Sequence, residues 1–334
     1  ERIAGGRESF DTARIAPAFA EAGVDAFHVS GGVIDRFVTQ MVNGAHYQDG
    51  LNAACAEAVR NAVDVPVIAV GRIHGPEMAA QMIQEGRADL IAMGRPLLAD
   101  PELPNKVKAG RAQDVRRCIS CENCIDSLES RFYLECAVNP RTGREAELEL
   151  RPATRRKHVV VIGSGPGGLE AARVAAERGH RVSLYERNGH LGGALVMAST
   201  VHEENQSFLD YLLREVKRLP VEVHLRKELN AADVKALAPD AVVVATGGRV
   251  VAPKITGDDL PHVRTGSEMR ELLAGKVTAE SAAKLPAWQR AAAKLLGGPV
   301  QPWMQPNVLR RATRFFMPLG KRIVIIGADL AAIE

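Results

Sequence analysis

The chain has 334 residues, of which 46% are hydrophobic and 25% charged, and its formal net charge at pH 7 is +3. One hydrophobic core rarely serves a chain of this length, so we expect two or more domains. The nearly balanced charge excludes a strong attraction to nucleic acid or to an acidic membrane surface. No run approaches about 18 apolar residues and no apolar signal segment opens the sequence, which predicts a soluble, non-secreted protein.

Residues 9–112 alternate amphipathic helical segments with short apolar runs that end in glycine. Such Val, Ile and Ala runs are typical of parallel strands covered on both faces. We expect Ser9 to be the N-cap of the first helix, and His28, inside the first strand, to be packed and hydrogen-bonded. The expected helices cover 9–22, 51–63 and 76–85, and the expected strands cover 25–30, 65–70 and 88–93.

Two of these strands are followed by a glycine and an arginine, in AVGRI and AMGRP. Parallel α/β barrels build their sites at the carboxyl ends of their strands. Glycine lets a ligand approach the backbone and arginine supplies a cation, so these loops predict a phosphate site; the alternative is that the glycines serve tight turns only. The residues concerned are Gly71, Arg72, Gly94 and Arg95.

The loop after the first strand, residues 31–50, should lie on the same face and carries Asp35, His46 and Tyr47. We predict that His46 and Tyr47 contact the substrate or supply a proton, because loops on this face carry the chemistry of such folds. The alternative is an ordinary polar loop.

Four of the five cysteines follow, with the spacing C-x2-C-x2-C-x11-C. Four thiolates in this arrangement can surround one compact metal centre, and iron–sulfur clusters are held by four cysteines. Zinc sites usually present two separated pairs, and disulfides concentrate in oxidising compartments. The spacing therefore favours a 4Fe-4S cluster over zinc or disulfides, in a reducing cytoplasm. The predicted ligands are Cys118, Cys121, Cys124 and Cys136.

After a charged linker, residues 158–186 run from an apolar strand through a glycine-rich turn and a helix to a second strand. Gly163, Gly165 and Gly168 permit the tight turn, approach of the backbone to a pyrophosphate, and close helix–strand packing. Glu186 ends the second strand, where it can accept hydrogen bonds from ribose hydroxyls. This complete unit predicts binding of an ADP moiety.

Residues 257–320 are irregular, and we assign them no chemistry. KRIVIIGADLAAIE, residues 321–334, begins a second unit of the same kind. Gly327 has the first glycine position, but Asp329 and Ala332 replace the second and third. An aspartate beside a pyrophosphate would repel it. The second site therefore binds NAD(P)H by a modified geometry, or it keeps the fold without the function.

VPVIAVGRI, EGRADLIAMGRPLLADPELPNK, the cysteine run and CAVNPRTGRE together resemble the FMN-containing reductases of the old yellow enzyme class that carry a cluster and a flavin domain. This family includes 2,4-dienoyl-CoA reductase, enoate reductases and trimethylamine dehydrogenase. The resemblance implies the last three strands of a (βα)8 TIM barrel, so we expect a fragment of a longer polypeptide. HLGG and ATGG resemble further flavin fingerprints, which favours FAD, or ADP in one branch, at Gly193, Thr246 and Gly247.

The resemblance implies electron flow from NAD(P)H through FAD and the 4Fe-4S cluster to FMN and then to an activated C=C bond. One alternative is amine oxidation with outward electron flow, and another is a truncated nucleotide-binding module. The expected partners are a small-molecule substrate and a second copy or an electron-transfer protein. The expected segments are 1–112 (partial FMN barrel), 113–156 (cluster and linker), 157–256 (FAD domain), 257–320 (helical insertion) and 321–334 (start of an NAD(P)-type domain).

Overall fold

A computed structural model forms two compact units, residues 1–149 and 150–334. It describes residues 4–33, 42, 44–130, 133–248, 254–273, 284–285, 287, 290–291, 306–315 and 322–325. Asp35, Gly327, Asp329 and Ala332 therefore lie outside the described residues. No helix within these ranges is long and apolar enough to cross a membrane.

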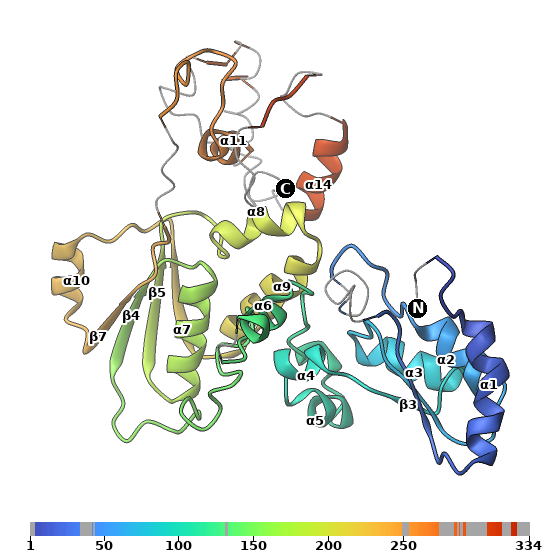
Figure 1. The fold of residues 1–334 in the computed structure, drawn as a ribbon. Helices are drawn as coiled ribbons and strands as arrows, with labels where there is room; N and C mark the ends of the chain where they lie inside the picture. Colours follow the sequence, from blue (N-terminus) through green and yellow to red (C-terminus); the bar gives the residue numbers. More distant parts are fainter. Residues whose placement is uncertain are drawn as a thin grey trace. The chain divides into compact units, whose positions relative to one another are not determined.

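The first unit is built on a three-stranded parallel sheet in the order β1-β2-β3, in which α2 connects β1 to β2 and α3 connects β2 to β3 (Figure 1). All three strands therefore end at the same edge of the sheet, as expected. The strands are shorter than predicted: β1 Phe27–Val29, β2 Val67–Ala69 and β3 Leu90–Ile91. The helices are α1 Ser9–Glu21, α2 Ala53–Arg60, α3 Pro76–Gln84, α4 Arg95–Ala99, α5 Leu103–Lys108 and α6 Asn123–Glu129, and a 3-10 turn covers Ala112–Asp114.

The core of this unit lies between α2 and the sheet, where Val59, Val67 and Ala69 are fully buried. Alternate residues of an apolar strand face opposite sides, so β2 needs apolar cover on both. Two predictions here are wrong. Ser9 is the first helical residue and Glu8 is the N-cap, and His28 is exposed on β1 rather than packed.

The second unit contains a four-stranded parallel sheet in the order β6-β5-β4-β7. The chain runs outward from β4 to β5 and β6, then crosses to place β7 on the other side of β4. The strands are β4 His158–Ile162, β5 Arg181–Glu186, β6 Val221–Leu225 and β7 Ala241–Val244. The helices are α7 Pro166–Glu177, α8 Ala194–Val201, α9 Glu204–Arg218, α10 Ala231–Leu237, α11 Gly266–Leu273 and α14 Pro306–Phe315.

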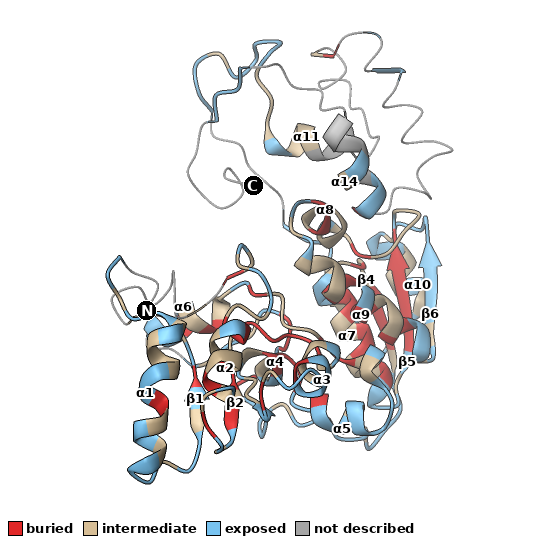
Figure 2. Ribbon diagram, turned by 90° about the vertical axis from the view of Figure 1, so that its right-hand side faces the viewer, coloured by how far each residue is buried: buried red, intermediate tan, exposed pale blue. Residues whose placement is uncertain are grey.

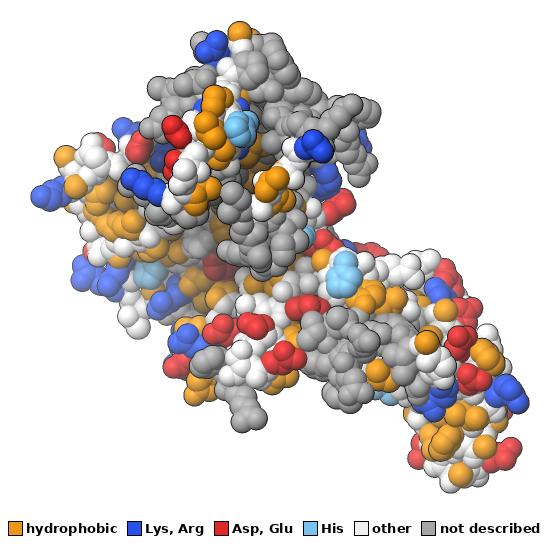
Figure 3. All heavy atoms as spheres, turned by 45° about the horizontal axis from the view of Figure 1, so that its top comes forward, with side chains coloured by type: hydrophobic (Ala, Val, Ile, Leu, Met, Phe, Trp, Pro, Cys, Tyr) orange, Lys and Arg blue, Asp and Glu red, His pale blue; other side chains and the backbone are white. Residues whose placement is uncertain are grey.

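Burial in this sheet is concentrated on its two central strands, as the red colour of β4 and β5 in Figure 2 indicates. Val160, Val161 and Leu184 are fully buried, whereas Val244 on the edge strand β7 is 70% exposed. Acidic and basic side chains lie interspersed on the face drawn in Figure 3, in keeping with the nearly balanced charge.

Candidate functional site

The strand-end loops of the first unit hold their arginines in fixed positions. Gly71 has a φ of 129°, and a Cβ there would lie 2.5 Å from Asn52 Nδ2, so only glycine fits. Arg72 follows with a φ of 52°, which is unusual for a residue with a side chain. Its Nη1 donates to the Gly44 carbonyl at 2.6 Å, and its Nε lies 2.9 Å from Asp49 Oδ1. These two contacts of Arg72 thus hold the loop after β2 against the loop of residues 44–52.

His46 and Tyr47 lie in the loop of residues 44–52. Their ring centroids are 4.3 Å apart, and the Tyr47 N–H donates to the Gly44 carbonyl. A Cβ added at Gly44 would lie 3.0 Å from Oε1 of Glu122, which belongs to the cysteine run, and 3.2 Å from the His46 ring. The two predicted substrate-side residues are therefore close to the cysteines. Their role in proton donation or substrate contact stays a prediction.

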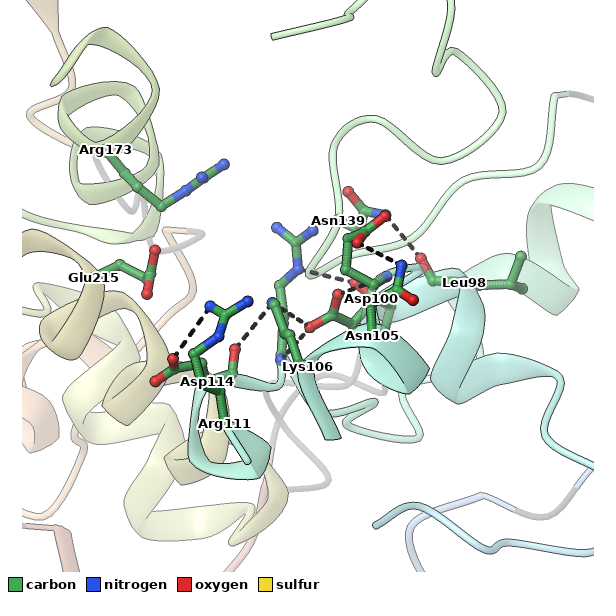
Figure 4. A network of polar contacts seen from close by, with 12 residues as sticks. Leu98, Asp100, Asn105, Lys106, Arg111, Asp114, Asn139, Arg173 and Glu215 are labelled. Carbon is green, nitrogen blue, oxygen red and sulfur yellow. Dashed lines mark hydrogen bonds and ion pairs between the residues drawn. The ribbon is translucent and has the colours of Figure 1, made fainter. Parts of the chain in front are cut away.

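Both ends of the cysteine run are fastened to one short segment, the end of α4. At the entry, Asp100 Oδ2 accepts from the Arg116 N–H at 2.8 Å and from Lys106 Nζ at 2.7 Å. At the exit, Asn139 Nδ2 and Thr142 Oγ1 donate to the Leu98 carbonyl at 2.8 and 3.0 Å. Figure 4 shows Lys106 turned toward Asp100 and Asn139 turned toward Leu98. We call this arrangement, formed by the six residues named here, the α4 clasp.

Between the ends of the clasp, the thiols lie near one another and near Arg95. Burial raises the pKa of the Cys118 thiol to about 11; the Ser120 N–H and the Arg95 guanidinium oppose this, and Cys136 and Cys121 add to it. Burial also raises the pKa of Cys124, again with Arg95 opposing. Positive charge beside a set of thiols favours the thiolate form that a metal needs. Arg95, predicted as a phosphate contact, therefore also acts on the thiols.

Four cysteines are the donor set that iron–sulfur clusters use. Two of these thiols, Cys118 and Cys124, have Arg95 nearby. Among the residues that the structure describes, no three His, Cys, Asp or Glu side chains are grouped to hold one metal ion. The group that the four thiols hold stays a prediction.

Glu122, between the second and third cysteines, was not predicted from the sequence. It has a φ of 60° and lies near Arg95, His46 and Arg72. Burial raises the pKa of its carboxyl group, and the nearby Arg95, His46 and Arg72 side chains oppose this rise. Charges from the strand-end loops, the 44–52 loop and the cysteine run thus meet at one place. No local pattern in the sequence indicates this meeting.

In the second unit, the three glycine segments converge at the carboxyl end of β4. A Cβ on Gly168 would collide with the Gly163 carbonyl, and one on Gly163 would collide with the Ala245 carbonyl. A Cβ on Gly193 would lie 2.8 Å from the Gly165 Cα, whereas one on Gly165 would meet nothing within 4 Å. The fold therefore requires glycine at positions 163, 168 and 193, whereas the open space at Gly165 leaves room for a ligand.

The strand order places this convergence where α/β sheets bind ligands. The chain turns to opposite sides of β4 as it enters β5 and β7, and such a switch point leaves a crevice outside the strand ends. The N-terminus of α7 begins there, and Thr246 and Gly247 follow β7 at the same edge. Free N–H groups of a helix N-terminus favour an anion.

Glu186 is buried at the end of β5 and bound to the same loop. Its Oε2 accepts from the Ser164 N–H at 3.0 Å and from Ser164 Oγ, and its Oε1 accepts from the Asn188 N–H at 2.7 Å. Burial disfavours the charged form, but the hydrogen bonds from Ser164 and Asn188 outweigh it and lower the pKa of the carboxyl group. An ionised carboxylate is the form that accepts from ribose hydroxyls.

The chain thus combines, in its first unit, strand-end arginines near four thiols and, in its second unit, a dinucleotide-binding type of fold. Residues 1–114 match the NADH:flavin oxidoreductase / NADH oxidase family, and residues 157–334 match the pyridine nucleotide-disulphide oxidoreductases. The chain belongs to the old yellow enzyme-like NADH:flavin oxidoreductases that carry a pyridine nucleotide-disulphide oxidoreductase domain. The predicted α/β class, with part of a TIM barrel and a Rossmann-like domain, is confirmed.

Relatives of this chain include enzymes named for opposite directions of electron flow. NADH oxidase of Thermoanaerobacter brockii is 41% identical over 83% of this chain and 43% of its own length. The solved 2-naphthoyl-CoA reductase complexed with 2-naphthoyl-CoA has a TM-score of 0.72 at 29% identity, over 87% of this chain and 46% of its own. The 6-hydroxypseudooxynicotine amine oxidase of Pseudomonas geniculata N1 has a TM-score of 0.70 at 30% identity, over 83% and 42%. The chain therefore spans less than half of each.

Proposed function

We propose that this chain is the electron-relaying part of an NAD(P)H-dependent oxidoreductase that reduces a C=C bond activated by a carbonyl group. When bound, FAD and FMN would supply hydride transfer, and a 4Fe-4S cluster between them would supply single-electron transfer. The observation that carries the proposal is the contact, within the first unit, of the cysteine run with the strand-end loops. The strand-end loops and the cysteine run are neighbours, because Gly44 lies close to Glu122 and Arg95 lies close to Cys118.

The residues of the first unit would bind the FMN and the cluster and orient the substrate. Arg72 and Arg95 would hold the phosphate of FMN, since a guanidinium pairs well with phosphate oxygens. Cys118, Cys121, Cys124 and Cys136 would ligate the cluster, which the clasp on α4 pre-arranges. His46 and Tyr47, on the same side, would contact the substrate or hold a proton for it.

The second unit would bind the adenine dinucleotide. The glycine-rich turn and the N-terminus of α7 would receive the pyrophosphate, where Gly165 leaves open space. Glu186 would accept from the ribose hydroxyls, and Gly193, Thr246 and Gly247 would border the same crevice. FAD rather than NAD is the proposed occupant, because three glycine segments converge there. NAD(P)H itself would bind to the second dinucleotide unit.

Amine oxidation with outward electron flow is the second candidate. It uses the same sites and differs in substrate and direction. The similarity to a solved amine oxidase at a TM-score of 0.70 supports it. The similarity to an NADH oxidase over 83% of this chain favours the reductive direction. We also propose a cytoplasmic location, because a reducing compartment keeps cluster ligands as thiols.

Purification of the 334-residue chain without oxygen tests the proposal. We expect about four iron and four sulfide per chain from one cluster, together with FAD released on denaturation. Cys124→Ser should abolish the iron, whereas Cys55→Ser, at the remaining cysteine, should leave it unchanged. Wild-type chain with neither iron nor FAD would refute the assignment of these two cofactors.

The direction of electron flow is tested on the intact polypeptide from which this sequence comes. NADH or NADPH oxidation that depends on an enoyl thioester supports the reductase. Reduction of an artificial acceptor by tertiary amines, with no activity on enoyl thioesters, would overturn it in favour of the amine dehydrogenase. A requirement for an added electron-transfer protein would identify that partner.

A further inference from the structure

Three buried polar side chains, Arg72, His74 and Ser120, link the loop after β2 to the cysteine run. Arg72 Nε lies 2.9 Å from Asp49 Oδ1, and the same oxygen lies 3.8 Å from His74 Nδ1. His74 Nε2 lies 3.2 Å from Ser120 Oγ, and the Ser120 N–H donates to Cys118 Sγ at 3.4 Å. These contacts lead from a guanidinium to a thiol, and the 3.8 Å step between Asp49 and His74 is longer than a hydrogen bond.

The imidazole of His74 lies between a carboxylate and a hydroxyl group. Asp49 Oδ1 is 3.8 Å from its Nδ1, and Ser120 Oγ is hydrogen-bonded to its Nε2 at 3.2 Å. This hydrogen bond fixes the serine at a point between two cysteines, whichever of the two atoms is the donor. Its φ of 52° is a left-handed conformation that a residue with a side chain rarely adopts. That conformation directs the Ser120 N–H at Cys118 Sγ, and the bond to His74 helps to maintain it.

Asp49 Oδ1 also makes the linkage sensitive to what binds at Arg72. It serves the guanidinium at bonding distance and the imidazole at a longer distance. An anion that approaches Arg72 competes with Asp49 for the guanidinium, so Asp49 is left to bond more closely with His74. The change reaches Ser120, whose N–H meets the sulfur. Hydrogen bonds to the sulfurs and nearby charge are what set the potential of an iron–sulfur centre.

We propose that His74 is a positioning residue that couples anion binding at Arg72 to the reduction potential of the metal centre held by Cys118. The coupling rests on the proposed function, since it requires that centre and that anion site. By thermodynamic linkage, reduction of the centre changes the affinity for the anion by the same factor. The enzyme would thus match the potential of one cofactor to the occupancy of its neighbour's phosphate site.

Inorganic phosphate is the probe, because it is redox-inactive and cannot itself reduce or oxidise the cluster. The full chain, with the cluster reconstituted and without FMN, is titrated with dithionite under an EPR readout. One sample contains phosphate, and a matched sample contains chloride at the same ionic strength. We expect phosphate to change the oxidised-to-reduced ratio at fixed potential about tenfold, about 59 mV for a one-electron couple, in the wild type.

The variants separate positioning from general damage. His74→Phe should lose the phosphate-dependent shift while keeping its iron. His74→Gln should regain part of it, because the amide can accept from Ser120 and donate toward Asp49. Ser120→Ala removes the hydroxyl alone and should also lose the shift, which tests the proposal even where His74→Phe does not fold. His28→Phe, at an exposed histidine, is the matched control and should behave as the wild type.

The outcomes distinguish the two proposals. Wild-type chain that binds no iron contradicts the proposed function, and the coupling falls with it. Wild-type chain that binds iron, but whose midpoint phosphate leaves unchanged, overturns the coupling alone. A phosphate shift of equal size in the wild type, His74→Phe and Ser120→Ala also overturns it, because the linkage would then run through other residues.

Discussion

Asp100→Asn is the most direct test of the clasp on α4. Asp100 is 2% exposed, and its carboxylate accepts from Lys106 Nζ, from the Arg116 N–H and from the Glu102 N–H. The asparagine has almost the same shape but one oxygen fewer. Whichever way its amide turns, an NH2 group faces at least one of these donors, and the charge that pairs with Lys106 is gone.

The magnitude follows from burial. A hydrogen bond to a charged group contributes about 1.5–3 kcal/mol, and breaking a fully buried ion pair costs roughly 3–5 kcal/mol. The Lys106 side chain keeps 18% of its surface exposed, so water partly compensates. We expect a loss of about 2 kcal/mol in the local free energy of opening. That corresponds to about a 30-fold change in an equilibrium constant.

Hydrogen exchange measures this opening directly, because the Arg116 amide is itself a donor to Asp100. In the full chain, the Arg116 amide should exchange about 30-fold faster in the variant. Asp64→Asn, at an exposed aspartate, is the control and should leave the rate unchanged. Equal exchange at Arg116 in the wild type and in Asp100→Asn would refute the reasoning that this carboxylate closes the entry to the cysteine run.

Three further predictions concern the second unit. Gly168→Ala forces a methyl group against the Gly163 carbonyl and should lower its thermal midpoint by several degrees, whereas Gly167→Ala, which meets open space, should not. Glu186 has a lowered pKa, so it stabilises the fold above about pH 4.3, the usual pKa of glutamate, and that stability is lost as the pH falls through the folded-state pKa; Glu186→Gln should flatten this acid dependence in denaturation curves. Arg173→Met removes the cation paired with Glu170 and Glu177 and should cost about 2–4 kcal/mol in guanidinium unfolding; wild-type stability in this variant would contradict a stabilising role for these pairs.

The sequence predicts the parts of the fold that follow from local periodicity. Short apolar runs locate the three strands of the first sheet and the strands β4 and β5 of the second, because a parallel strand covered on both faces has few other compositions. The ends of elements are less well predicted. Ser9 has the chemistry of an N-cap, yet Glu8 occupies that position, since the choice between neighbouring residues depends on how the chain enters the helix.

The candidate sites divide in the same way. The glycine segments can be recognised in the sequence because glycine marks an unusual local backbone conformation. The four cysteines can be recognised by their spacing. The groups that orient them are not: His74 and Ser120 are 46 residues apart in sequence, and Leu98 and Thr142 are 44 apart. An aspartate, histidine or serine has no local pattern that tells a surface role from a buried contact of this kind.

The strand order of the second unit has a consequence for the time course of folding. β4 and β5 pair across one helix, but β7 pairs with β4 only after the whole segment from α7 to α10 has been laid down, and the Asp240–His158 bond spans 82 residues. Closing the longer loop costs more chain entropy, so β7 is expected to dock late. The loop after β7 borders the proposed dinucleotide site, so a newly made chain would acquire affinity for a dinucleotide only at the end of folding, and the ligand would bind finished molecules alone.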